Sequence, residues 1–318
     1  MKRLKRIGKI VLKIFLVGLI TLFIFELSYR YQWVDFYASE WRYHNEKNTD
    51  EQDNSILVFG DSFSADPNGW VYMLRDSLGE QREVFNAAIP GVGPETHAFI
   101  FNRKKEQAKP KHIIVQMYVG NDQYDYNKPV NWSKQSFFRN IFWSLSNRFR
   151  VLNFLNYRIG QSSVEDNVAN PKEEDVFNSA TYSPRTKLYI QGAENYPANL
   201  ILLEEDGIRG ISASLIHMRD NCGEKCKFSV LLIPHCTQVS ANYVNDYKKL
   251  GSKIEDTVVG KSYWNKNLTT LGLDVLDPLP YFIELEEQGE QLYYANDPHL
   301  NATGNAWLTS FVIKELTK

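Results

Sequence analysis

The sequence has few cysteines: only Cys222, Cys226 and Cys236 among 318 residues. Three cysteines leave a zinc site short of a fourth ligand, and a redox-active pair would be separated by two residues, whereas CGEKC has three between its cysteines. In an oxidising compartment Cys222 and Cys226 could form a local disulfide, although Cys236 could equally pair with one of them. Of these arrangements we favour a structural disulfide between Cys222 and Cys226.

The sequence also lacks an excess of basic residues beyond its amino terminus. The whole chain has a formal net charge of −2, and six lysines and arginines with no acid precede residue 14, which leaves −8 on residues 14–318. An acidic chain without a basic stripe is a poor candidate for binding nucleic acid or an anionic glycan by charge alone. We therefore expect no nucleic-acid partner.

One long apolar run lies at the amino terminus, where residues 7–27 are interrupted only by Lys9, Lys13 and Glu26. Its length is close to the roughly 20 residues that cross a bilayer core as a helix. No pair of small residues with cleavage-site spacing follows the run, and no early cysteine is present to take a lipid, so we favour an uncleaved anchor over a removed signal peptide. The basic residues before the run place that end in the cytoplasm and the rest of the chain in the periplasm or outside the cell.

These features divide the chain into four predicted parts. A cytoplasmic basic tail covers 1–6, a transmembrane anchor in contact with the lipid bilayer covers 7–28, a tether covers 29–54, and a globular domain covers 55–318. The tether is predicted because the stretch is polar and aromatic and ends in NEKNTDEQDN.

Short β-rich runs alternate with helical patterns along the globular part. The β-rich runs are 56–59, 83–86, 112–118, 228–233 and about 273–276, and the helical patterns are 70–78, 95–107, about 198–221 and 301–316. Such alternation predicts a parallel sheet with helices on both faces, which binds its ligands at the carboxyl ends of the strands. A long insert at about 123–197 breaks the alternation, and we expect it to cover the site or to lie on the membrane.

Residues that can do chemistry follow these predicted strands. Ser62 lies in GDSF after the first strand, Gly91 ends NAAIPG after the second, Asn121 lies in GND after the third, and Asp297 and His299 lie in DPHLNATG before the last helix. A serine hydroxyl is a weak nucleophile at neutral pH, so a histidine must take its proton and an acid must orient the imidazole. Backbone and amide donors then stabilise the oxyanion of a tetrahedral intermediate.

In this order the four blocks resemble the SGNH hydrolases, also called the GDSL family of esterases and lipases. The resemblance covers residues 55–318 apart from the insert and implies the SGNH hydrolase fold, a three-layer α/β/α sandwich with a flavodoxin-like parallel sheet. It implies catalytic roles for Ser62, Asp297 and His299, and an oxyanion hole formed by Ser62, Gly91 and Asn121. It implies no cofactor and no metal.

One feature departs from the usual family pattern. Many members space the acid and the histidine as D-x-x-H, whereas here only Pro298 separates Asp297 from His299. A D-x-H spacing is known in the branch that resembles the alginate-type polysaccharide O-acetyltransferases. An α/β-hydrolase, which uses the same triad, would need G-x-S-x-G around its nucleophile, and Ser62 lacks that motif. We expect Asp61 to cap a turn rather than to catalyse.

Three functions are compatible with these residues. The first is a membrane-anchored, outward-facing esterase that removes O-acetyl or other acyl groups from an envelope carbohydrate through an acyl-enzyme on Ser62. The second is an O-acetyltransferase of the same fold that receives its acyl group from a membrane acyltransferase. The third, of another class, is a non-catalytic anchor that binds a glycan or an envelope partner.

Overall fold

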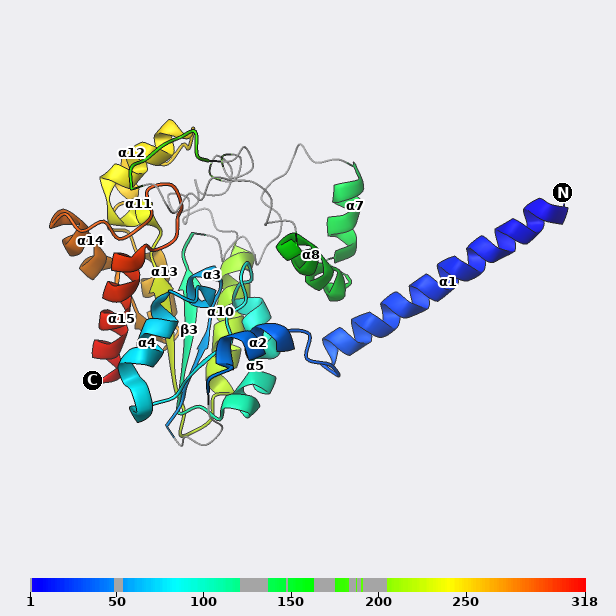
Figure 1. Ribbon diagram of the computed structural model, residues 1–318, viewed down its shortest axis with the longest axis horizontal. Coiled ribbons are helices and arrows are strands. Elements are labelled where there is room, and N and C mark those ends of the chain that lie inside the picture. The colour runs from blue at the N-terminus through cyan, green and yellow to red at the C-terminus, as the bar shows by residue number, and fades with distance from the viewer. Residues whose placement is uncertain are drawn as a thin grey trace. The chain divides into compact units, whose positions relative to one another are not determined.

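A computed structural model describes residues 2–48, 54–120, 137–146, 148–162, 175–182, 187, 190 and 205–318 of this chain (Figure 1). It divides into two compact units. The first unit comprises residues 1–39 and 132–167, and the second comprises residues 40–131 and 168–318. The insert predicted at 123–197 therefore contributes to both units.

The second unit is built on a parallel sheet of five strands in the order β2-β1-β3-β4-β5. The strands are β1 (Ile56–Phe59), β2 (Val84–Asn86), β3 (His112–Tyr118), β4 (Lys227–Ile233) and β5 (Asp274–Leu276). Every residue of β1, β2 and β3 is buried, as expected for parallel strands covered on both faces. The predicted flavodoxin-like sheet is confirmed, since this strand order is that of flavodoxin.

Helices cover both faces of this sheet and complete the predicted three layers. Figure 1 shows α4 (Trp70–Leu78) and α15 (Ala302–Leu316) on one side of the strands. On the other side lie α5 (Pro94–Ala108) and α10 (Glu205–Asp220). The helical patterns found in the sequence account for all four helices.

Further short helices of this unit escaped prediction. They are α3 (Ser62–Ala65), α11 (Cys236–Val239), α12 (Ala241–Lys249), α13 (Tyr263–Thr270) and α14 (Leu279–Glu287), with 3-10 turns at Gly79–Gln81 and Asp256–Val258. Several begin at ordinary capping residues. The N-cap Ser240 accepts a hydrogen bond from Asn242 N at the start of α12. Asp277, one residue before the N-cap Pro278, accepts one from Leu279 N at the start of α14.

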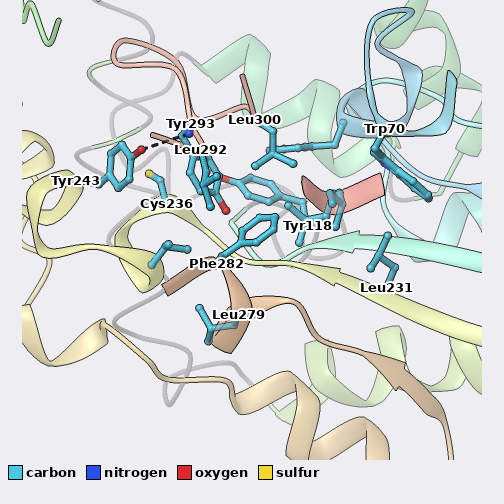
Figure 2. Close-up of a cluster of buried hydrophobic side chains, with 14 of the residues drawn as sticks. Trp70, Tyr118, Leu231, Cys236, Tyr243, Leu279, Phe282, Leu292, Tyr293 and Leu300 are labelled. Carbon is cyan, nitrogen blue, oxygen red and sulfur yellow. Dashed lines mark hydrogen bonds between the residues drawn. The ribbon is translucent and has the colours of Figure 1, made fainter. Parts of the chain in front are cut away.

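A hydrophobic cluster joins α4, the sheet, α12, α14 and the loop before α15 (Figure 2). Tyr293, in that loop, is fully buried, and its hydroxyl donates to the Pro234 carbonyl at 2.7 Å. Its backbone N donates to the Tyr243 hydroxyl at 3.3 Å, the contact drawn as a dashed line in Figure 2. These contacts fix the loop that carries Asp297 and His299 to the core.

The disulfide of this unit pairs Cys222 with Cys226, where the chain passes from α10 to β4. Their Cα atoms lie 5.5 Å apart. Cys236 is a free, buried thiol at the start of α11. This is one of the three pairings that the three cysteines allow.

The segment predicted as a tether over 29–54 contains a helix, α2 (Ala38–Asn45), and residues from Glu40 onward belong to the second unit. The Asn45 side chain accepts from Asn86 N and donates to Asn86 O, both at 2.8 Å, and Asn48 donates to Val84 O at 2.9 Å. Trp41 stacks on Phe85 with ring centroids 5.7 Å apart. Asparagine side chains thus occupy the open backbone groups of the edge strand β2, which differs from a free tether.

The first unit contains α1 (Lys2–Arg30), α7 (Phe137–Ser146) and α8 (Arg150–Ser162). Within the described residues, the segment Arg6–Arg30 of α1 is the single helix long and apolar enough to cross a membrane. The span predicted at 7–28 lies inside it. Side chains of α1 between residues 7 and 25 are largely exposed.

Candidate active site

Ser62 is positioned by a tight turn at the carboxyl end of β1. Asp61 is the N-cap of α3, and its Oδ1 accepts a hydrogen bond from Phe63 N at 2.9 Å. Gly60, just before it, has no room for a side chain, because a Cβ there would collide with Ser64 Oγ and Gln116 Oε1. Gly60 and Asp61 therefore serve the turn itself, and they leave Ser62 at the start of a short helix.

A polar residue inside the apolar strand β3 braces this turn. Gln116 is fully buried, and its Oε1 accepts hydrogen bonds from Asp61 N at 3.1 Å and from Ser64 Oγ at 2.9 Å. We did not predict this role. The signal was available, because a glutamine in the strand HIIVQMY interrupts an otherwise apolar run.

The structure brings Ser62, His299 and Asp297 together across more than two hundred residues of chain. Ser62 Oγ lies 2.8 Å from His299 Nε2, and His299 Nδ1 lies 2.5 Å from Asp297 Oδ1. The side chains of His299 and Asp297 are 27% and 20% exposed, so the group is held in protein and still open to solvent. This is the order of contacts in a serine, histidine and acid triad.

The D-x-H spacing allows one carboxylate oxygen to hold the histidine at two points. Asp297 Oδ1 also accepts a hydrogen bond from the backbone N of His299 at 2.8 Å. The ring of Phe63, which is buried, lies 4.5 Å from the imidazole between centroids. Backbone and ring contacts therefore restrain the side chain of His299.

Asp61 is close to the triad but is not placed to react. It is completely buried, and burial raises the pKa of its carboxyl from 3.8 to about 6, against opposing contributions from the Phe63 N–H and from His299. Its Oδ1 is occupied by the cap to Phe63. The prediction that Asp61 caps a turn agrees with this contact.

A second buried histidine supports the same turn. His97 Nε2 lies 3.1 Å from the Gly60 carbonyl, to which it donates, and burial lowers the pKa of His97 to about 4. The ring is therefore neutral at physiological pH. His97 is fully buried and therefore occupies a core position behind the turn.

The two other predicted oxyanion donors are Gly91 and Asn121. Gly91 follows β2 in an exposed turn with φ of +71°, a conformation that favours glycine. The block before it is tied to the Ser62 turn, since Ile89 N donates to Gly60 O at 2.9 Å and Asn86 Nδ2 donates to Ser64 O at 2.7 Å. Asn121 lies outside the described residues.

Part of the insert contacts the loop that carries the acid. Asn296 is buried, its Oδ1 accepts from Asn178 N at 2.7 Å, and its Nδ2 donates to Val176 O at 3.0 Å. Tyr182 Oη donates to Ala295 O at 3.4 Å. Residues 175–182 thus hold the residue next to Asp297, a contact that no local pattern in the sequence indicates.

Comparison with known proteins identifies structural similarity only. No protein-family model and no curated protein matches the chain. The chain is similar to the crystal structure of an acetyl xylan esterase, AlAXEase, at 11% identity and a TM-score of 0.43, covering 82% of this chain and 98% of that one. A lipase/acylhydrolase from Enterococcus faecalis matches at 14% identity and a TM-score of 0.38, covering 83% and 95%.

An acetyl xylan esterase from Geobacillus stearothermophilus matches at 12% identity and a TM-score of 0.43, covering 83% of this chain and 94% of that one. At such identities and TM-scores, the activity of the present chain has to be argued from its own residues.

Proposed function

We propose that this chain is a serine esterase of the SGNH type that forms an acyl-enzyme on Ser62. The observation that carries the proposal is the 2.8 Å contact between Ser62 Oγ and His299 Nε2, with Asp297 on the other ring nitrogen. A non-catalytic anchor gives no reason for a nucleophile, a base and an acid to meet in this order. Four blocks in the order of the SGNH family support the same assignment.

The proposed reaction begins when Ser62 Oγ attacks the carbonyl carbon of the ester while His299 Nε2 takes the hydroxyl proton. Asp297 stabilises the resulting imidazolium through Nδ1. The tetrahedral intermediate collapses, the carbon–oxygen bond to the leaving alcohol breaks, and the imidazolium returns its proton to that alcohol. Water, deprotonated by His299, then attacks the acyl-enzyme and releases the acid with free Ser62.

The oxyanion of each intermediate needs hydrogen-bond donors. We assign this role to the backbone N–H groups of Ser62 and Gly91 and to the side-chain amide of Asn121. Loss of one such donor typically lowers turnover by about 100-fold or more.

We further propose that α1 crosses the membrane with its basic end in the cytoplasm, and that the second unit faces the periplasm or the outside of the cell. An outward-facing enzyme held at the membrane suits an O-acylated, most simply O-acetylated, envelope carbohydrate as substrate. Resistance to alkaline extraction, together with protease digestion of the second unit from the outer face only, would support this topology. Release of the chain by alkali would contradict it.

A second candidate function is transfer of the acyl group to a sugar hydroxyl, with a membrane acyltransferase as donor. The observation in its favour is the D-x-H block, which resembles that of the alginate-type O-acetyltransferases. The first half-reaction on Ser62 is the same, and only the acceptor differs. Release of acetate with no transfer to added oligosaccharides would reject this candidate.

The esterase is tested by hydrolysis of p-nitrophenyl acetate by the full-length chain. Ser62→Ala should abolish turnover above background, whereas Ser310→Ala, at an exposed serine of α15, should leave it unchanged. Equal rates for the Ser62→Ala variant and the unmodified chain would reject the proposed function.

A further inference from the structure

We propose that α7 and α8 lie on the surface of the bilayer that α1 crosses, with an apolar stripe of α7 in the headgroup region and Arg148, Arg150 and Arg158 near anionic phospholipid. The proposal rests on the membrane anchoring proposed above, and it is independent of the esterase chemistry. Its evidence lies within the first unit.

The carboxylate of Glu26 joins the outer end of α1 to the start of α8. Glu26 Oε1 accepts a hydrogen bond from Arg150 N at 3.1 Å, and Oε2 accepts one from Val151 N at 2.9 Å. These are the first two residues of α8, whose N–H groups have no partner within the helix. Glu26 is buried and also pairs with Arg30 one turn later. An acid in an apolar helix is thus explained by the cap it provides.

Further contacts hold α8 against the residues that leave α1. Arg30 Nη2 donates to Arg148 O at 2.6 Å. The ring of Phe36 lies 5.1 Å from Tyr29 and 5.1 Å from Phe154, measured between centroids. Arg158 donates to Phe36 O at 2.8 Å. Helix α8 is therefore fixed at the level where the apolar helix ends, which is the level of the lipid headgroups if α1 spans the bilayer.

Helix α7 presents an apolar stripe to the outside. Phe137, Ile141 and Leu145 are 73%, 41% and 45% exposed, and their spacing of four residues places them on one face. Ser146, on the opposite face, is buried. Tyr31 and Trp33, just after α1, are also exposed, and their rings stack with centroids 6.1 Å apart. Tyrosine and tryptophan are enriched where proteins meet the membrane–water interface.

The positive charge of residues 137–162 favours a lipid surface over a protein partner as the structure that contacts the apolar stripe of α7. Residues 137–162 contain four arginines and no acid, whereas residues 14–318 as a whole carry −8, the −2 of the chain less the +6 before residue 14. An amphipathic, basic and aromatic helix pair is typical of segments that lie in the membrane interface. Basic residues close to the membrane are attracted by anionic headgroups.

The experiment uses the full-length chain in lipid nanodiscs with an environment-sensitive NBD dye at Ile141→Cys. A matched variant carries the dye at Ser310→Cys, an exposed position on α15. The native cysteines do not compete, because Cys222 and Cys226 form a disulfide and Cys236 is buried. Nanodiscs are made of phosphatidylcholine alone or mixed with phosphatidylglycerol, each with and without a lipid that carries a nitroxide near its headgroup.

We expect blue-shifted emission and nitroxide quenching for the dye at position 141, more strongly with phosphatidylglycerol, and neither effect at position 310. Arg148→Gln combined with Arg150→Gln should remove the gain from phosphatidylglycerol. Emission at 141 like that at 310 would overturn the proposal, as would a blue shift without quenching, which would mean that protein covers the stripe. Equal quenching in both lipids would overturn the role of anionic lipid.

Hydrolysis of p-nitrophenyl acetate is measured on the same samples. An active enzyme with an unquenched dye would reject this inference and leave the esterase intact. A quenched dye on an inactive enzyme would support this inference and reject the esterase.

Discussion

One carboxylate oxygen of Asp297 contacts two groups of His299: Oδ1 lies 2.5 Å from Nδ1 of the imidazole and accepts the backbone N–H of the same residue at 2.8 Å. The first contact fixes the tautomer and stabilises positive charge on the ring, and the second fixes the turn. A side chain that keeps the turn but removes the charge separates the two effects.

We expect Asp297→Asn to lower kcat for ester hydrolysis by about 10⁴-fold at neutral pH, because the neutral amide removes the negative charge that stabilises the His299 imidazolium. The unfolding free energy should change little, since the amide oxygen can still accept the His299 N–H. Steady-state kinetics and denaturant unfolding check both statements. Asp220→Asn, at an exposed carboxylate of α10, is the control. A loss of less than tenfold would remove Asp297 from the triad.

Asp61 should make the stability of the chain depend on pH. Burial raises its pKa to about 6 in the folded chain from 3.8, so between these values the folded state holds a proton that the unfolded state releases. Unfolding free energy should therefore fall as pH rises across this window, by on the order of 3 kcal/mol at most, at about 1.4 kcal/mol per pKa unit. Asp61→Asn, which keeps the cap oxygen, should remove that fall. The unfolding free energy of both proteins is measured against pH by denaturant unfolding. The same pH dependence in both would contradict the raised pKa of Asp61.

Asn296 should act as a positioning residue for the acid. Asn296→Ala leaves Asn178 N and Val176 O without this partner, and unmade buried hydrogen bonds cost about 1–3 kcal/mol each. We expect faster hydrogen exchange in residues 175–182 and a lower kcat, with Asn296→Asp, which retains the acceptor, intermediate between the two. Unchanged exchange in 175–182 with normal kcat would show that the contact has no such role.

Helix α2 should belong to the folding unit rather than to a tether. A chain that begins at Ser55 lacks the Asn45 and Asn48 side chains on the edge of β2, and it should unfold at lower denaturant than a chain that begins at Ala38. Within the full chain, Asn45→Ala should cost about 1–3 kcal/mol, because the backbone N–H and C=O of Asn86 lose this partner. Asn242→Ala, exposed on α12, serves as the comparison. Equal denaturant midpoints for the two truncated chains would show that residues 38–54 are a tether after all.

Much of the fold could be predicted because its signals are local. Apolar runs of β-branched and aromatic residues mark the five strands, and the alternation with helical patterns implies a parallel sheet. The meeting of Ser62 with His299 followed from strand-end placement and the family resemblance. Each of these inferences depends on patterns within a few residues.

The parts that escaped prediction depend on single polar side chains that bind distant backbone. No periodic pattern in the sequence marks these hydrogen bonds, which join Asn45 to Asn86, Asn296 to Asn178, and Glu26 to the start of α8. Gln116 is an exception, since a lone amide in a buried strand has to find partners and could have been noticed.

The most direct test of the central claim is peptide mass spectrometry of the full-length chain after exposure to a fluorophosphonate, which captures a serine activated by a neighbouring base. The account predicts one covalent phosphonate on the peptide that carries Ser62, and loss of that adduct in His299→Ala. An unmodified Ser62, or an adduct that persists without His299, would contradict it.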